Sequence, residues 1–251
     1  DKWVFLLACV LLIQPLPLYY VIRACLDPSF ITPAIPTRSF WDATFAVQSH
    51  GSFLETVRVN LWEGQIASLA WAWDHGRVFQ TAALFLLGML IGRRGLFQKE
   101  NLKVWNKILA GALIAFFPLY GLGNMLPAFI VNKSILTPLS LIITSLSNFS
   151  FMLVLVSGVI FAFYNTNMHY LLMKITPYGK MSLTNYITQS IVGSMLYYNW
   201  GFALHNQCGI TVSCLAGIAF FILQFTFCRW WMSHHSHGPM EYIWKRATWL
   251  K

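Results

Sequence analysis

The forty residues from Ser134 to Met173 include no Asp, Glu, Lys or Arg. A water-soluble domain interrupts its apolar stretches with charge more often, because part of its surface has to be solvated. About 18 consecutive apolar residues are enough to cross the ~30 Å hydrocarbon core of a bilayer as a helix. Four further uncharged stretches of comparable character occur elsewhere. The sequence therefore predicts an all-α fold, a polytopic membrane helix bundle.

Composition agrees with this class. The 251 residues are 57% hydrophobic, 16% aromatic and 10% charged, and the mean hydropathy is +0.58. Ordinary globular domains carry about 25% charged residues. The net charge of +9 could indicate nucleic-acid binding, but the basic residues form no long cluster with interleaved aromatic side chains. The lipid bilayer is therefore the expected partner, and nucleic acid is not.

Apolar stretches predict a single membrane domain over residues 1–251 with about six transmembrane helices. The spans are predicted at about 3–22, 70–92, 108–131, 136–164, 182–203 and 209–228. Pro15 and Pro17 should kink the first span, because proline removes a backbone donor. The fourth span is too long for a perpendicular crossing, so it has to tilt or break near Asn148.

The distribution of basic residues predicts the orientation of the spans. Six spans place twelve Lys and Arg residues on one side of the membrane and five on the other, the five being Arg23, Arg38, Arg58, Arg77 and Lys133. Cytoplasmic loops carry the excess of basic residues in membrane proteins. Both ends of this chain are therefore expected in the cytoplasm.

The long segment between the first two spans, residues 23–77, is predicted as an outer loop. Within it, Ser52 and Glu55 have the spacing of a capping box, in which a hydroxyl and a carboxylate satisfy each other's backbone donors at a helix start. The sequence predicts a helix here that lies on the outer membrane surface.

The segment after the last span, residues 229–251, is predicted as an amphipathic tail on the cytoplasmic leaflet. Pro239 suits the first position of a helix. Glu241 and Lys245 are four residues apart, in the order that favours an ion pair along a helix. The basic residues of the tail would lie near anionic lipid.

The strongest candidate for a ligand site is a polar stripe at the start of the fifth predicted span. Ser182, Asn185, Tyr186 and Gln189 lie within one sector of a helix with 3.6 residues per turn. Polar side chains in hydrocarbon are costly unless they pair or face a cavity. Two interpretations stay open: hydrogen bonding between helices, or the lining of a ligand cavity.

A weaker candidate lies in the outer loop, where His50, Glu55 and Arg58 are close in sequence. A histidine near a carboxylate can perform acid–base chemistry, although the capping box gives Glu55 a structural role. No phosphate-binding glycine loop or nucleophile elbow is present. No residue is assigned as catalytic from the residues alone.

Histidine and cysteine patterns predict no metal site. His234, His235 and His237 are clustered, but no carboxylate or thiol lies near them in sequence, and no pair of the five cysteines has metal-ligand spacing. Cys25 and Cys208 are both expected near the outer face, and a disulfide between them stays open.

Two motifs near the end of the chain carry a family resemblance. Residues 179–186 read G-K-M-S-L-T-N-Y and are followed by Gln189, and residues 238–245 read G-P-M-E-Y-I-W-K. These resemble the patterns G-R-M-S-L-T-N-Y-x-x-Q and G-P-x-E-W-x-W-R of the YeiB-like family (domain of unknown function 418). The stretch 87–95 is similar to the family's G-M-x-x-G-R-x-G. Lysine replaces arginine at 180 and 245, which loses the bidentate geometry of arginine.

The resemblance implies several expectations. Family members are usually longer, so an N-terminal half of the same protein is expected as a partner, and the protein is expected in the bacterial cytoplasmic (inner) membrane. The family is distantly similar to membrane acyltransferases such as heparan-alpha-glucosaminide N-acetyltransferase. That similarity implies an acyltransferase-like protein acting on envelope glycan or lipid, an acyl-CoA-like donor, no cofactor held by this chain, and a catalytic histidine upstream of Asp1. The alternatives are a small-molecule carrier or channel, or a non-enzymatic envelope or assembly protein.

Overall fold

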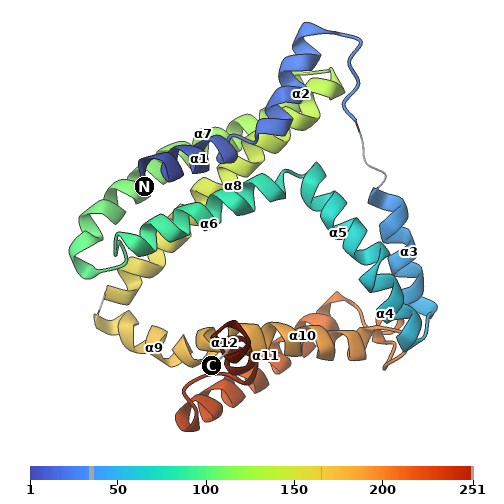
Figure 1. Ribbon diagram of the computed structural model, residues 1–251, viewed down its shortest axis with the longest axis vertical. Coiled ribbons are helices and arrows are strands. Elements are labelled where there is room, and N and C mark those ends of the chain that lie inside the picture. The colour runs from blue at the N-terminus through green and yellow to red at the C-terminus, as the bar shows by residue number, and fades with distance from the viewer. Residues whose placement is uncertain (34–36, 165, 250–251) are drawn as a thin grey trace. The chain divides into compact units, whose positions relative to one another are not determined.

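The computed structural model describes residues 1–33, 37–164 and 166–249. Within these ranges every regular element is a helix (Figure 1), which confirms the all-α fold class. Three helices are long and apolar enough to cross a membrane, and two bent helix pairs bring the number to as many as five. The three long helices are α7 (Leu102–Phe129, extended at its start by the 3-10 turn Lys99–Asn101), α8 (Lys133–Tyr164) and α11 (Ile210–His234).

The chain forms two compact units, whereas the sequence predicted a single membrane domain. The first unit comprises residues 1–37 and 66–165, and the second comprises residues 38–65 and 166–251. The six predicted spans stay a prediction, since α10 (Ser182–Tyr197), in the place of the fifth, has 16 residues and is not among the helices that reach spanning length.

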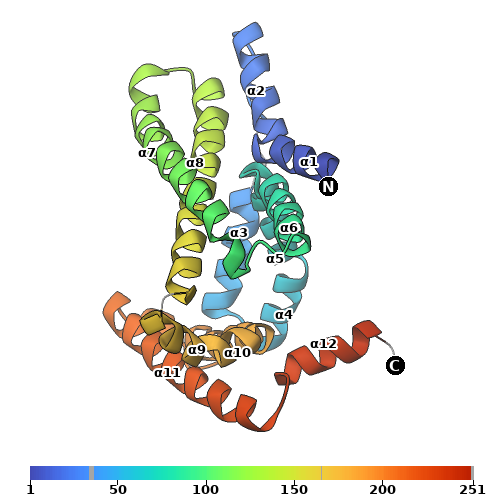
Figure 2. The same cartoon turned by 90° about the vertical axis from the view of Figure 1, so that its left-hand side faces the viewer.

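The first unit is built around a helical hairpin. Helices α7 and α8 pack against each other along their lengths, α6 packs against α1, and α8 also packs against α2 (Figures 1 and 2). The further helices of this unit are α1 (Lys2–Leu12), α2 (Pro15–Leu26), the larger part of α5 (Glu63–Asp74) and α6 (Arg77–Arg93). Helix α8 is continuous through Asn148, so of the two alternatives predicted for this long span, a tilt or a break, the break is absent.

Two of the predicted spans are broken helices. The chain bends by 51° between α1 and α2 and by 77° at the break ahead of α6. The first bend confirms the predicted kink, with Pro15 opening α2 directly after Gln14, whose φ is 64°. At the second bend Gly76 has a φ of 62°, and a left-handed residue ends the regular helix, so residues 70–92 do not form one continuous helix.

The second unit contains helices where the sequence predicted loops. Much of the predicted outer loop is helical, and residues 166–180, predicted as a connection between spans, form a helix. The helices of this unit besides α10 and α11 are α3 (Thr37–His50), α4 (Phe53–Leu61), α9 (Thr166–Lys180) and α12 (Pro239–Trp249), with a 3-10 turn at Leu204–Asn206. These helices are shorter or more polar than a membrane span, and a search for long apolar stretches does not detect such helices.

The capping box at the start of α4 is confirmed. The Ser52 backbone N–H donates to Oε2 of Glu55 over 2.8 Å, and the Glu55 N–H donates to the Ser52 hydroxyl over 3.4 Å. The start of α12 at Pro239 is confirmed as well. Local sequence signals for helix starts therefore predicted both positions.

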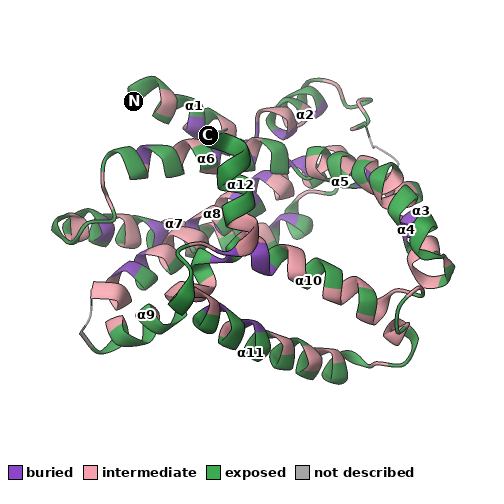
Figure 3. Cartoon of the chain, turned by 60° about the horizontal axis from the view of Figure 1, so that its bottom comes forward, coloured by how far each residue is buried: buried purple, intermediate pink, exposed green. Residues whose placement is uncertain are grey.

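Figure 3 shows exposed residues along most of the helices, and many of these residues are large and apolar. On α11, for example, Leu215 is 62% exposed and Leu223 is 67% exposed. Contiguous apolar patches of this kind are rare on soluble monomers, whereas lipid tails provide an apolar environment for them. The exposed faces fit a bilayer as the surrounding medium.

Candidate functional site

The polar stripe predicted on α10 takes part in hydrogen bonds among three helices. The Asn185 side-chain amide, in a residue 5% exposed, donates to the backbone oxygen of Tyr178 on α9 over 3.0 Å and accepts from the Cys228 thiol of α11 over 3.2 Å. The Gln189 amide donates to Gln224 on α11 over 2.9 Å and to the Tyr178 hydroxyl over 3.0 Å. Bonds of this kind are what the inter-helix interpretation requires.

The other two residues of the stripe do not share this environment. Ser182 and Tyr186 are exposed, Tyr186 to 70%. Asn185 and Gln189 are thus bonded to neighbouring helices, but only Asn185 of the four is buried, since Gln189 is exposed as well. None of the four lines the cavity described below.

The outer-loop group is not assembled around an acid–base pair. His50 ends α3, and Arg58 lies in the last turn of α4. Hydrogen bonds from the Ser52 backbone N–H and from its hydroxyl lower the pKa of Glu55. A carboxylate stabilised in this way is a weaker base, so Glu55 serves the helix start.

Two residues of the histidine cluster contact backbone carbonyl groups of their own helix. His234 and His235 place Nδ1 at 3.0 and 3.2 Å from the carbonyl oxygens of Trp230 and Trp231, each one turn earlier. No group of three His, Cys, Asp or Glu side chains suited to a metal ion occurs within residues 1–33, 37–164 and 166–249. The disulfide left open by the sequence is not formed, since Cys25 and Cys208 are both free.

The two C-terminal motifs are joined through Glu241. Its carboxylate accepts from the backbone N–H groups of Leu183 and Thr184 over 2.8 and 3.0 Å and from the Thr184 hydroxyl over 2.5 Å. The Thr184 hydroxyl in turn accepts from the Met240 N–H over 3.1 Å. Glu241 thereby supplies acceptors for the otherwise unpaired N–H groups at the start of α10, and its negative charge suits that end of the helix dipole.

Glycine is needed beside this contact. A Cβ on Gly238 would overlap Oε2 of Glu241 and would lie 3.0 Å from Cγ of Met181, a side chain that is fully buried. The predicted pair of Glu241 with Lys245 is therefore wrong, because the carboxylate is turned toward α10. The Lys245 ammonium lies 3.2 Å from Nε2 of His237 instead.

We expect the contact between α10 and α12 to weaken only in acid. Burial opposes ionisation, but the bonds from Thr184 and Leu183 outweigh it and hold the pKa of Glu241 below its ordinary 4.5. A group with a lowered folded-state pKa stabilises the fold above its unfolded pKa, and this stability is lost as pH falls through the folded value. Corrected for intrinsic rates, hydrogen exchange at Leu183 and Thr184 should be constant between about pH 8 and 5 and rise below the unfolded pKa. Protection that is already lost near neutral pH would contradict this assignment.

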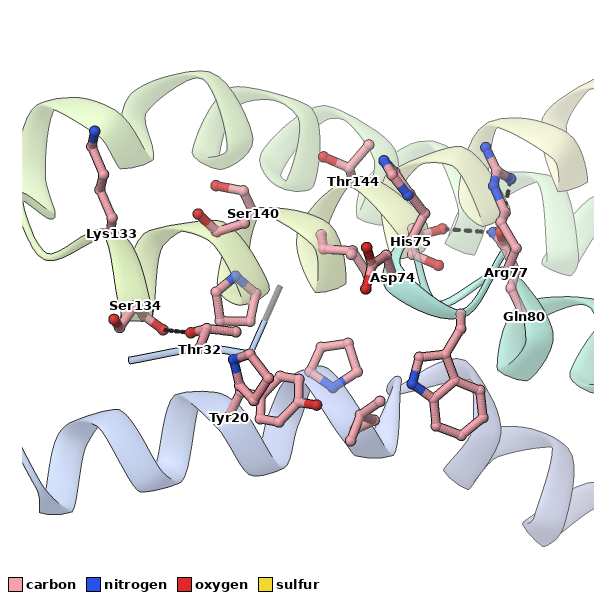
Figure 4. Close-up of a pocket in the computed structure, with 18 of the residues that line it drawn as sticks. Tyr20, Thr32, Asp74, His75, Arg77, Gln80, Lys133, Ser134, Ser140 and Thr144 are labelled. Atoms are coloured by element: carbon pink, nitrogen blue, oxygen red, sulfur yellow. Dashed lines mark hydrogen bonds between the residues drawn. The ribbon is translucent and has the colours of Figure 1, made fainter. Parts of the chain in front are cut away.

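A cavity of about 660 Å³ lies within the first unit, next to both helix breaks. Helix α8 provides one wall over residues 133–148, a rise of about 22 Å at 1.5 Å per residue. Figure 4 shows Lys133 and Ser134 at one end of the cavity and Asp74, His75 and Arg77 at the other, with Ser140 and Thr144 between them. The remaining lining includes Leu16, Pro17 and Tyr20 of α2, Trp73, Gln80 and Ile31.

Buried amides hold the two helix breaks against the middle of α8. The Gln14 amide, fully buried, donates to the Ser145 hydroxyl over 3.0 Å. The Gln80 amide lies 3.5 Å from the Ser145 backbone oxygen, and Gly76 approaches the Gln14 side chain closely. Irregular backbone at membrane depth is tolerated where it is buried in protein or lines a cavity, and residues next to both breaks line the cavity here.

The polar end of the cavity is built from the break ahead of α6. His75 places Nδ1 at 3.0 Å from the Trp71 carbonyl oxygen and stacks on the Trp71 ring, with 4.9 Å between centroids. Arg77 donates to Oε1 of Gln80 over 2.9 Å, and its guanidinium lies 5.7 Å from the centroid of Trp71. These contacts fix an imidazole and a guanidinium at the edge of one cavity.

Sequence reasoning missed this site because it assigned residues 23–77 to a loop. Arg77 lines the same cavity as Ser145 of α8. Gly76 between a histidine and an arginine is the signal in the sequence that could have indicated a helix break there.

Long apolar helices, with large apolar side chains exposed along them, define the class as an integral membrane helical protein. The model of the family described as "Protein of unknown function (DUF418)" matches residues 91–251. The chain therefore belongs to the DUF418 family, as the two C-terminal motifs predicted.

Curated relatives agree with the family. The uncharacterized protein YxaH of Bacillus subtilis (strain 168) is 30% identical over 95 residues, covering 38% of this chain and 24% of that protein. An uncharacterized 39.9 kDa protein in the amylase 3' region of Bacillus acidopullulyticus is 32% identical over 78 residues, 31% of this chain and 22% of that protein. YeiB of Escherichia coli (strain K12) is 29% identical over 83 residues, 31% of this chain and 20% of that protein.

The matched segments thus span less than a quarter of each of these relatives. No solved structure matches the chain.

Proposed function

We propose that this chain is part of an acyltransferase-like membrane protein acting on envelope glycan or lipid, and that the cavity holds the acceptor. The observation that carries the proposal is the position of His75 at the polar end of a mostly apolar cavity whose lining also includes hydroxyl and amide groups. Such groups suit the hydroxyls of a sugar or of a lipid headgroup. Imidazole is the side chain that most often acts as a general base.

The geometry of His75 supports a base at Nε2. When Nδ1 carries the proton and donates to the Trp71 carbonyl, Nε2 keeps its lone pair for a substrate. In the proposed step, Nε2 takes the proton of an acceptor hydroxyl while the acceptor oxygen attacks the carbonyl carbon of a thioester donor. The carbon–sulfur bond breaks, and the leaving thiolate takes up the proton from the imidazolium.

The orientation predicted from charge fits an acceptor from the envelope. Lys133, at one end of the cavity, is among the five basic residues assigned to the outer side. A cavity that opens there is accessible to envelope components. The acyl donor is inferred from the family resemblance, and the proposal for this chain concerns the acceptor side only.

Replacing His75 with Gln should abolish acyl transfer. The full-length protein in nanodiscs would be given a radiolabelled acyl-CoA and an extract of envelope glycan and lipid, and label in the extract would be measured. Loss of a general base costs about 10²–10⁴ in rate, so H75Q should lose at least ~100-fold.

The matched control is His234→Gln. His234 makes the same contact with a carbonyl one turn earlier, at 3.0 Å, but lies outside the cavity. H234Q should retain the wild-type rate. Transfer by H75Q at the wild-type rate would overturn the assignment of His75 as the base.

A carrier is the second candidate, and the two helix breaks favour it. Many transporters bind substrate where discontinuous helices meet near the bilayer midplane, and here Gln14 and Gln80 meet at Ser145. Uptake of an envelope precursor into proteoliposomes without acyl transfer would establish the carrier in place of the enzyme.

A further inference from the structure

Helix α12, the last of the chain, begins next to the end of a helix that can cross a membrane. Helix α11 is long and apolar enough to span a bilayer, and its last turns contain Trp230 and Trp231. Tryptophan is enriched where a membrane protein passes from hydrocarbon to headgroups. The indole N–H of Trp231 donates to the backbone oxygen of His237 over 3.0 Å, which holds the start of α12 close to α11. This arrangement predicts that α12 begins at headgroup depth.

Beyond its first turn, α12 presents its side chains to the surroundings. Every residue from Tyr242 to Trp249 is exposed (Figure 3), and Trp244 is exposed to 68%. Ile243 and Ala247 are four residues apart and so lie on one face of the helix. A helix that combines large apolar side chains with basic residues is suited to the boundary between headgroups and acyl chains.

The exposed part of α12 is positively charged. Residues 242–249 contain Lys245 and Arg246 and no acid. The Arg246 guanidinium lies 5.6 Å from the centroid of the Tyr242 ring, and the Lys245 ammonium lies 3.2 Å from Nε2 of His237. Both contacts are to uncharged or basic groups, so they add no negative charge to this surface. Anionic lipid headgroups have the complementary charge.

The single acid of α12, Glu241, is directed away from this surface. Its carboxylate accepts hydrogen bonds from the backbone N–H groups of Leu183 and Thr184, so its charge is satisfied within the protein while α12 packs on α10. If α12 left α10, a free carboxylate would join the two exposed cations. An anionic surface should therefore bind the packed form of α12 more tightly than the released form, and a ligand favours the state that it binds more tightly.

We propose that α12 binds anionic lipid headgroups through Lys245 and Arg246, and that this binding strengthens the contact of α12 with α10. The partner is the surface of a bilayer that contains anionic lipid. This inference involves neither the cavity nor the proposed acyl transfer, and it is tested without reference to either.

Hydrogen exchange of the full-length protein in nanodiscs tests the proposal. Replacing part of the phosphatidylcholine with phosphatidylglycerol should slow exchange at the backbone amides of residues 244–248 by about 10-fold or more, because two basic residues then lie near an anionic surface. Exchange at Leu183 and Thr184 should slow by about 5-fold, because release of α12 would bring one carboxylate near the same surface. High salt should remove both effects, since it screens exposed charges.

A double variant connects these effects to the two cations. Lys245→Gln combined with Arg246→Gln should lose both effects of phosphatidylglycerol. In phosphatidylcholine alone, this variant should exchange at Leu183 as the wild type does. The matched control is Lys103→Gln combined with Lys107→Gln, which removes two exposed cations from α7 and should keep both effects.

Two outcomes would contradict the proposal. If phosphatidylglycerol does not slow exchange along α12, or slows it equally in K245Q/R246Q and in the wild type, α12 is not a lipid-binding surface of the kind proposed. If exchange slows along α12 but not at Leu183 and Thr184, lipid binds the packed and released forms equally, and the proposed effect on α10 is wrong.

Discussion

Replacing Gly76 with Ala should destabilise the protein by about 3 kcal/mol. A left-handed conformation costs a residue with a Cβ about 1–2 kcal/mol, and Gly76 has a φ of 62°. The added Cβ would also overlap the Gln14 side chain and approach Leu141 to 3.1 Å. Gln14 is fully buried and cannot swing aside, and overpacking of this kind costs about 1–3 kcal/mol.

The measurement is the unfolding midpoint in nanodiscs, which should fall by roughly 6–12 °C. Gly88→Ala is the matched control, because Gly88 lies within α6 and its added Cβ would have no neighbour within 4 Å. That variant should be neutral or gain up to about 1 kcal/mol from helix propensity. Equal stability of the two variants would show that the break at Gly76 is not held by Gln14.

Replacing Glu241 with Ala should release α12 from the start of α10, at a cost of about 2–3 kcal/mol. Loss of a helix N-cap side chain costs about 0.5–2 kcal/mol, and hydrogen bonds to a charged group are stronger than average. The substitution leaves the N–H groups of Leu183 and Thr184 without their present acceptor. Hydrogen exchange at these two amides should accelerate by about 30-fold or more, since 1.4 kcal/mol corresponds to a factor of ten.

Two variants make this test specific. Glu241→Gln keeps one acceptor oxygen and should fall between the wild type and E241A. Lys245→Ala removes the partner predicted from helix spacing, yet Lys245 lies against His237, so exchange at Leu183 should stay at the wild-type rate. If K245A accelerates exchange as much as E241A does, an ion pair along α12 controls the contact, and the assignment of Glu241 to α10 is wrong.

The outcomes for individual residues show where local reasoning succeeds. Ser52 and Pro239 were predicted as helix starts because a cap depends on residues within one turn. Glu241 was misassigned because its partners are 57 and 58 residues away in the chain. The spacing along α12 offers Glu241 only the side chain of Lys245. The backbone N–H donors of Leu183 and Thr184 become available because α12 packs onto α10.

The distance in sequence between interacting residues also explains which candidate site was predicted and which was missed. The stripe of Asn185 and Gln189 was detected because helical periodicity gathers polar groups on one face. The cavity was not, because Gln14, Ser145 and the pair His75 and Arg77 come from three separate segments. No local sequence pattern connects these segments. They meet only because both helix breaks lie against the same part of α8, at Ser145.

The sequence by itself determined the all-α class, the apolar helices, the family and the starts of α4 and α12. Each depends on composition, periodicity or short motifs, which are properties of neighbouring residues. Only the tertiary structure decided that the span over 70–92 is broken, that Glu241 serves α10, and that a cation and an imidazole share a cavity. These features depend on contacts between segments that are far apart in the sequence. A buried polar group without a partner is costly, so each such group bonds to whatever partner the packing brings near, and the spacing of residues in the sequence does not reveal that partner.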